Sequence, residues 1–212
     1  AEMAGGRCLI GDEMGIGKTI SAIGYSALHP EARPAIVVCP SNVKFNWKKE
    51  LNKWLPSESV YVVQPDNELK VQHFKDIAES LGGEQIRTGN NAKKYIKSRG
   101  FNPMTYIPKC DFVVVNYDVI DKYKDSLINI LPKLIILDES HYIKNSGSTN
   151  KPVQRTVSTL EVCSYVEKVI ALSGTAIASR PKEFFNTLNL LSPALFRSEW
   201  DFKQRYCDPY HN

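Results

Sequence analysis

The sequence lacks the features that mark membrane, secreted and metal-stapled proteins. No apolar run approaches the roughly 20 residues needed to cross a bilayer, and the first residues, AEMAGGR, have no signal-peptide pattern. The five cysteines are widely spaced, with no C-x-x-C pair and no histidine pair nearby. We therefore expect reduced cysteines in an intracellular protein, with no membrane partner and no structural metal.

Strong charge and internal repetition are absent too. The formal net charge is only +4 over 212 residues, which permits a polyanionic partner without arguing for one. No repeat or low-complexity tract interrupts a composition of 42% hydrophobic and 24% charged residues. This length and composition suit one α/β core, so we expect a single domain over 1–212.

A glycine-rich turn stands near the N-terminus, within the stretch CLIGDEMGIGKT from Cys8 to Thr19. A short apolar run precedes the glycines and a helical pattern follows them, and this order is typical of a phosphate-binding loop. Lys18 would reach the β and γ phosphates of a nucleotide, and the Thr19 hydroxyl would bind Mg²⁺. The alternative is a chance glycine turn before an amphipathic helix. The predicted nucleotide-binding residues are Asp12, Glu13, Met14, Gly15, Ile16, Gly17, Lys18, Thr19 and Ile20.

Apolar runs of strand length alternate with helical patterns along most of the chain. This alternation predicts an α/β fold, a mainly parallel sheet with helices on both faces. The expected strands are 8–10, 35–39, 60–63, 111–116, 134–137 and 168–172, and the expected helices are 19–28, 43–54, 68–81, 117–131 and 181–191. Four lysines of the second helix are expected on a solvated outer face: Lys44, Lys48, Lys49 and Lys53.

The pattern degrades over about 82–109, which we interpret as a loop-rich insertion. Basic residues alternate there with Tyr95, Phe101 and Tyr106. Such a mixture suits a nucleic-acid surface, but a solvated loop is the interpretation that we favour. The basic residues are Arg87, Lys93, Lys94, Lys97, Arg99 and Lys109.

Polar groups follow several of the expected strands, at the end where parallel strands face a ligand crevice. Asp138 and Glu139 follow the run LIIL. One carboxylate would hold Mg²⁺, usually through water, and the other would orient and deprotonate an attacking water. His141 follows in the same turn and caps or packs a strand end in the simpler interpretation. The tripeptide Ser173, Gly174 and Thr175 follows another strand, and the pair Ser41 and Asn42 a third.

Five segments together carry a family resemblance: GDEMGIGKT, PSNVKFNWKKEL, VVVNYDVI, ILDESHYIKN and ALSGTAIASRPKEFFNTLNLLSP. In this order they resemble motifs I, Ia, Ic, II and III of the Swi/Snf-type branch of superfamily 2 helicase-like ATPases. The segment WDFKQRYCD and the W-L-P after the second helix resemble the HARP-like annealing helicases of that branch. The resemblance covers the chain except about 65–109.

The resemblance implies the first RecA-like lobe of an ATP-dependent translocase or annealing helicase on double-stranded or forked DNA, of the fork-repair type. Lys18, Asp138 and Glu139 would be catalytic, and Thr19 and Asp138 would bind magnesium beside ATP. Hydrolysis would be coupled to motion by His141, Ser173, Gly174 and Thr175. The DNA backbone would lie near Ser41, Asn42, Asn116 and Tyr117. Such a protein would be nuclear in a eukaryote and cytoplasmic in a bacterium or virus.

The resemblance also implies a second RecA-like lobe, which would follow Asn212 and supply an arginine across the cleft. We therefore expect the isolated lobe to be nearly inactive as an ATP hydrolase. Ala176 and Ser140 depart from the usual residues of the family without removing a catalytic group. Two alternatives stay open: the catalytic lobe of a nucleosome remodeller, and an inactive nucleotide-binding scaffold for protein interaction.

Overall fold

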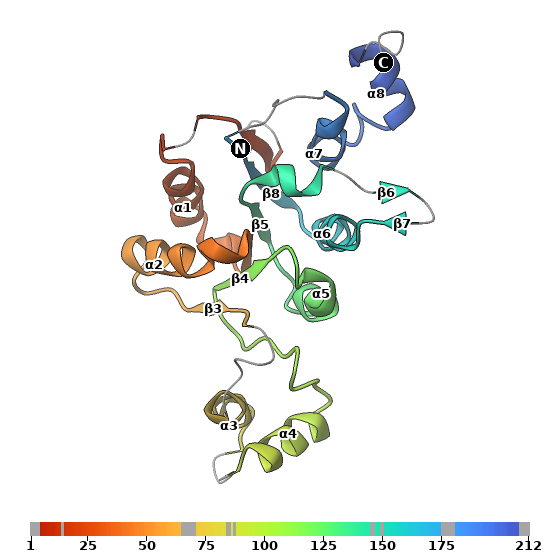
Figure 1. The fold of residues 1–212 in the computed structure, drawn as a ribbon. Helices are drawn as coiled ribbons and strands as arrows, with labels where there is room; N and C mark the ends of the chain where they lie inside the picture. Colours follow the sequence, from red (N-terminus) through yellow and green to blue (C-terminus); the bar gives the residue numbers. More distant parts are fainter. Residues whose placement is uncertain are drawn as a thin grey trace.

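The computed structural model describes residues 5–13, 15–64, 71–83, 86, 88–144, 147–148, 151–174 and 181–207. Its described strands form a six-stranded sheet in the order β1-β8-β5-β2-β4-β3, and every neighbouring pair is parallel (Figure 1). The strands are β1 (Arg7–Ile10), β2 (Ala35–Cys39), β3 (Val60–Val62), β4 (Phe112–Asn116), β5 (Leu134–Leu137) and β8 (Lys168–Leu172). The parallel sheet predicted from the sequence is therefore confirmed.

The central strands are buried on both faces, as their continuous apolar runs predict. Alternate residues of β2 enter two different cores: Ile36 and Val38 in one, Val37 and Cys39 in the other. Helices α1 (Lys18–Leu28) and α2 (Lys44–Trp54) cover the second core. The first core lies under α5 (Ile120–Asn129), α6 (Gln154–Ser164) and α7 (Phe185–Leu191).

Helices α3 (Val71–Ser80) and α4 (Gly89–Ser98) pack together beyond the β3 edge of the sheet (Figure 1). They enclose a small core of their own that includes Phe74, Ile77 and Ile96. The expectation of a loop-rich stretch over 82–109 is therefore wrong for 89–98. The α4 sequence contains two asparagines, three lysines and a serine, so its two apolar anchors, Ala92 and Ile96, were too few to reveal a helix.

Several further elements complete the chain. The sequence did not predict α6, α8 (Glu199–Tyr206) or the short antiparallel pair β6 (Gly147–Ser148) and β7 (Lys151–Pro152). No helix among the described residues is long and apolar enough to cross a membrane. The short helical turns are η2 (Pro30–Ala32), η3 (Ser41–Val43), η5 (Ser140–Ile143) and η6 (Pro181–Phe184).

All five cysteines are free. Burial raises the pKa of the Cys39 and Cys163 thiols to about 12. A thiol with so high a pKa is protonated at neutral pH and is a poor nucleophile or metal ligand. Among the described residues no group of histidine, cysteine and carboxylate side chains could hold a metal ion in a closed cluster.

Candidate nucleotide-binding site

The predicted nucleotide-binding and catalytic groups follow three strands that are neighbours in the sheet. The phosphate loop follows β1, Ser173 follows β8, and Asp138 follows β5, in the spatial order β1-β8-β5. Main-chain hydrogen bonds continue past the strand ends: Ser173 N donates to Ile10 O of β1 at 3.1 Å, and Asp138 N donates to Val38 O of the neighbouring strand β2 at 2.8 Å. Because all these strands are parallel, the groups meet at one edge of the sheet.

The loop after β1 has the backbone of a phosphate cradle. Gly15 and Gly17 have φ angles of 85° and 99°, a region that favours glycine, while no atom lies within 4 Å of a Cβ built at either position. The glycines are therefore needed for the turn itself. Lys18 Nζ donates to the carbonyl oxygens of Asp12 and Glu13 at 2.8 Å each, so the loop curls around the ammonium group. Met14 lies outside the described residues.

Asp138 and Glu139 leave β5 in a tight turn. Glu139 has φ 51° and ψ 56°, the left-handed region that a residue with a side chain rarely adopts. Burial raises the pKa of Asp138, a hydrogen bond from Trp47 opposes that rise, and the positive charge of Lys18 also lowers the pKa. The phosphate-loop lysine and the carboxylate therefore interact electrostatically across the strand ends.

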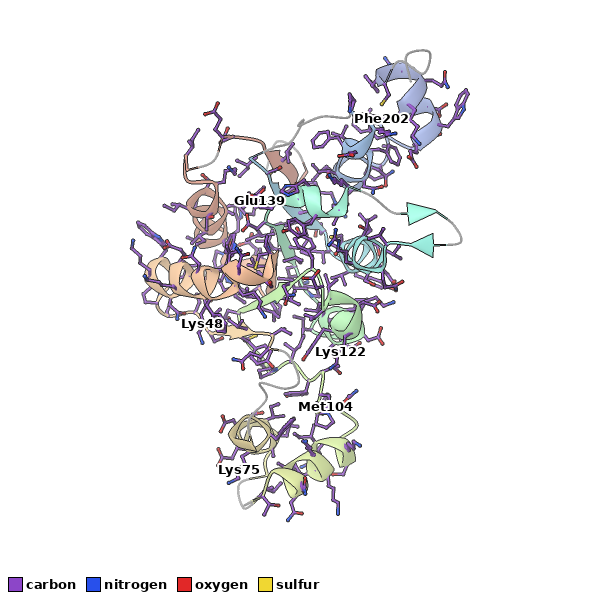
Figure 2. The ribbon with its side chains drawn as sticks, in the orientation of Figure 1. Lys48, Lys75, Met104, Lys122, Glu139 and Phe202 are labelled. Carbon is purple, nitrogen blue, oxygen red and sulfur yellow. The ribbon has the colours of Figure 1, made fainter. Side chains whose placement is uncertain are left out.

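Glu139 also contacts His141, which follows it by two residues in the same turn. His141 Nδ1 lies 3.2 Å from Glu139 Oε2, which would make an ion pair with a protonated imidazole. The two atoms are close enough for an ion pair but are not aligned for a hydrogen bond. The buried Oε2 of Glu139 therefore has no hydrogen-bond partner among the described residues. A buried carboxylate oxygen without a donor is a suitable acceptor for a water proton. Figure 2 labels Glu139 at this edge.

The predicted coupling tripeptide is only partly described. Ser173 is buried, with 1% of its surface exposed, and it lies between the ends of β1 and β5. Gly174 follows it at the same edge. Thr175 lies outside the described residues.

The predicted DNA-contacting residues follow β2 and β4, the next two strands along the edge. Ser41 and Asn42 are exposed in η3, as a surface contact requires. Asn116 and Tyr117 are only 5% and 1% exposed. The Tyr117 ring turns inward and stacks on Tyr142 with the centroids 5.2 Å apart. That Asn116 and Tyr117 lie near the DNA backbone stays a prediction.

The lysines of α2 differ in exposure, with three at the surface and one buried. Lys48, Lys49 and Lys53 are exposed, as expected for a solvated face. Lys44 is only 6% exposed, and its Nζ donates to Val63 O at 2.9 Å, so the expected solvated position is wrong for this residue. The long aliphatic side chain of a lysine can cross an apolar core when its ammonium group finds an acceptor.

The basic surface of 88–110 is exposed, but its aromatic residues mostly face inward. Tyr95 Oη donates to Leu81 O at 3.0 Å and receives hydrogen bonds from Arg99. Tyr106 packs against the α3–α4 core, and Phe101 lies against its ring. Tyr95 and Tyr106 are therefore used in packing, whereas Phe101 is 44% exposed. Arg87 lies outside the described residues; the exposed cations are Lys94, Lys97, Arg99 and Lys109.

Two aromatic residues hold Asp138: Trp47, which the sequence did not predict for the site, and Tyr117, which was predicted in a different role. Trp47 Nε1 donates to Asp138 Oδ2 at 2.8 Å, and Tyr117 Oη donates to Asp138 O at 2.9 Å. In the sequence, Trp47 is simply one apolar position of the helix 43–54. Its indole N–H could have indicated the contact, because a buried N–H needs an acceptor and the nearby core otherwise consists of hydrocarbon.

A model of the SNF2-related domain matches residues 2–212. The chain belongs to this family. SNF2-related proteins of known sequence align over almost its whole length. The human protein named "DNA annealing helicase and endonuclease ZRANB3" is 30% identical over 208 residues, and the alignment covers 97% of this chain and 16% of that protein.

A second SNF2-related protein gives the same picture. The Xenopus laevis protein named "SWI/SNF-related matrix-associated actin-dependent regulator of chromatin subfamily A-like protein 1" is 30% identical, over 96% of this chain and 17% of its own length. The chain therefore spans about a sixth of these curated relatives. The resemblance inferred from the motifs, including the likeness to the HARP-like annealing helicases, is confirmed.

The fold agrees with solved SNF2 structures. The Sulfolobus solfataricus SWI2/SNF2 ATPase core in complex with double-stranded DNA superposes with a TM-score of 0.63 at 23% identity, covering 98% of this chain and 36% of that one. The same core domain solved separately gives a TM-score of 0.60 at 22% identity. The RecA-like α/β fold predicted from the sequence is confirmed.

Proposed function

We propose that this chain is the ATP-binding lobe of an ATP-dependent translocase or annealing helicase that remodels double-stranded or forked DNA. The observation that carries the proposal is the meeting of the phosphate loop, the Asp138–Glu139 pair and Ser173 at the ends of three adjacent strands. The name of the human relative, which describes an annealing helicase, favours the same activity. The protein would act inside the cell, in the nucleus of a eukaryote.

The residues at this edge fit a nucleotide with magnesium. Helix α1 begins at Lys18 with no side-chain cap on its N-terminal N–H groups and no acidic residue in its first turn. Free N–H groups at a helix N-terminus bind phosphate oxygens. Lys18 would exchange its two loop carbonyls for phosphate oxygens, and Thr19 and Asp138 would hold Mg²⁺. Magnesium, when bound, offsets negative charge on the phosphate oxygens.

Glu139 would act as the general base. Its orphaned Oε2 is buried at the carboxyl end of β5, next to the imidazole of His141. We propose that this oxygen accepts a proton from the attacking water. The residues that would couple hydrolysis to motion are His141, Ser173, Gly174 and Thr175. Ser41 and Asn42, exposed after the neighbouring strand β2, would meet the DNA backbone, a contact that does not depend on sequence.

A second lobe would complete this site. Ile16 and Ile20 are 66% and 48% exposed beside the phosphate loop, which is apolar surface that a facing lobe would cover. An arginine supplied across such a cleft contributes several orders of magnitude to hydrolysis in related reactions. We therefore expect the 212-residue chain alone to bind ATP weakly and to hydrolyse it negligibly.

The test joins this chain to a second lobe and measures ATP hydrolysis with forked, duplex and single-stranded DNA. Glu139→Gln should keep ATP binding and lower turnover by about 10²–10⁴-fold, while Lys18→Ala should lose both. Normal turnover by Glu139→Gln would overturn the assignment of the base. Duplex affinity should fall steeply as salt rises if the contact is to phosphates.

Two alternatives give different results in the same experiment. A nucleosome remodeller, which the chromatin name of one relative suggests, would be stimulated more by nucleosomes than by forks. An inactive scaffold would show neither hydrolysis nor salt-dependent DNA binding. The intact set Lys18, Thr19, Asp138 and Glu139 argues against the scaffold.

A further inference from the structure

Asp138 is held at three points by groups from different parts of the chain. Its backbone N–H donates to Val38 O on β2, and its carbonyl accepts from Tyr117 Oη after β4. Its carboxylate accepts from Trp47 Nε1 on α2, at 2.8 Å from Oδ2. The first two contacts fix the backbone, and the third reaches the group that would meet magnesium.

Trp47 is a rigid donor for that carboxylate. The indole is 1% exposed and packs in the core shared with Leu51, Val37 and Cys39, so its ring cannot turn without disturbing that core. A carboxylate that approaches a metal is usually oriented by such a second hydrogen bond, because an unsupported side chain samples several rotamers. The core thus fixes the direction from which the N–H meets Oδ2.

We propose that Trp47 is a positioning residue, which fixes the carboxylate of Asp138 in the orientation that binds the magnesium of ATP. This inference rests on the proposed function of the site. Helix α2 begins directly after η3, which carries Ser41 and Asn42. Trp47 therefore joins the proposed magnesium ligand to the helix that starts at the proposed DNA contact.

The same helix offers a matched control. Trp54 Nε1 also donates to a carboxylate, Glu50 Oε2, at 3.1 Å. That pair is local, four residues apart, and Trp54 is 48% exposed. Trp54→Phe therefore removes an indole–carboxylate hydrogen bond that has no connection to Asp138, while Trp47→Phe removes the one that does.

The experiment titrates a fluorescent ATP analogue into the 212-residue chain, up to millimolar concentrations, once with Mg²⁺ and once with EDTA. Trp47→Phe should weaken binding about 10-fold with Mg²⁺ and leave binding in EDTA unchanged. Trp54→Phe should match the parent chain in both. A Trp47→Phe variant that behaves like Trp54→Phe would overturn the proposal. Equal weakening with and without Mg²⁺ would also overturn it, since that is the result of a packing role alone.

A parent chain that binds no nucleotide with Mg²⁺ would instead refute the proposed function, so the two failures are distinguishable. A second measurement covers the case in which Trp47→Phe does not fold. In the Trp54→Phe/Trp200→Phe chain, Trp47 is the sole tryptophan. Its fluorescence should change when Mg²⁺ and ATP are added together and stay constant when either is added alone; a constant signal throughout would overturn the proposal.

Discussion

The sheet and the α3–α4 pair are two regions built on different principles. Trp47 and Asp138 are 91 positions apart, and the sheet brings them into a hydrogen bond. In the α3–α4 pair the described polar contacts of Tyr95 span 14 positions to Leu81 and four to Arg99. Figure 2 labels Lys75 and Met104 at the α3–α4 end and Glu139 away from them, at the far end of the sheet.

This difference has a consequence for stability. The two cores of the sheet share strands, so disturbing one affects the other and the site at the strand ends. Among the residues that the structure describes, the core of α3 and α4 contains only five buried side chains, and it lies apart from the other two cores. Regions with few buried contacts open at a lower free energy than the rest of a domain. We expect the α3–α4 pair to open while the sheet stays folded.

The largest effect should come from a matched pair of core substitutions. Ile136 in β5 and Ile96 in α4 are both fully buried. Ile136→Ala should lower the free energy of unfolding by about 4 kcal/mol and Ile96→Ala by about 2 kcal/mol, since a small core can collapse around the lost methyl groups. Chemical denaturation measures both values.

Hydrogen exchange then locates the damage. Ile96→Ala should speed exchange in 71–98 alone and leave nucleotide binding intact, whereas Ile136→Ala should speed exchange throughout the sheet. Equal exchange changes in the two regions would show that they form one cooperative unit.

A second prediction concerns Arg7, which joins the first strand to α7 and to the loop between α6 and β8. Its guanidinium donates to Leu190 O at 2.7 Å, to Val166 O at 2.8 Å and to Glu167 O at 3.2 Å. Arg7→Ala should lower stability by about 2 kcal/mol, because partly buried carbonyls lose a charged donor. Arg197 donates at the surface to Ala194 O, three residues away, so Arg197→Ala is the control and should have little effect. Similar midpoints for the two variants would contradict this role.

The third prediction tests the seam where the α3–α4 excursion returns to the sheet. Asp111 Oδ2 accepts from Ser59 N at 2.7 Å and from Ser59 Oγ at 2.6 Å, which joins the starts of β3 and β4. These hydrogen bonds hold the pKa of Asp111 below its usual range. Asp111→Asn should lower stability by about 1 kcal/mol at neutral pH, a modest value because the carboxylate is partly exposed.

The pH dependence of this difference has a definite sign. A depressed folded-state pKa stabilises the protein above the unfolded value of roughly 4, and the contribution is lost as pH falls through the folded pKa. The gap between the parent chain and Asp111→Asn should therefore close in acid. A gap that stays constant with pH would mean that the hydrogen bonds act independently of charge.

The same contrast explains how much could be predicted from the sequence. The sheet could be predicted because its buried strands are continuous apolar runs, such as AIVVC and LIIL, with polar residues directly after them. The placement of Lys18, Asp138 and Ser173 at one edge follows from that order alone, because parallel strands bring their ends together.

The direction of individual side chains could not be predicted in this way. Tyr117 carries a hydroxyl at a strand end, where a polar group commonly faces solvent, yet it turns inward to the Asp138 carbonyl. Lys44 was predicted to be solvated, but its side chain crosses the core and donates to Val63 O. Helix α4 has too few apolar residues for its period to be visible, since its partner α3 and the return loop supply most of its core.

The smallest predicted effect compares two serines, one in each region. Ser140 is 1% exposed, and its buried Oγ has no hydrogen-bond partner among the described residues. Ser140→Ala removes an unsatisfied hydroxyl and should leave stability unchanged or raise it by up to about 1 kcal/mol. Ser80 Oγ donates to Ile77 O at 2.7 Å in α3, so Ser80→Ala loses a made hydrogen bond and should lower stability by about 0.5 kcal/mol. Thermal midpoints compare the two; a clear loss of stability in Ser140→Ala would mean that its hydroxyl has a partner at the carboxyl end of β5, beside the proposed base.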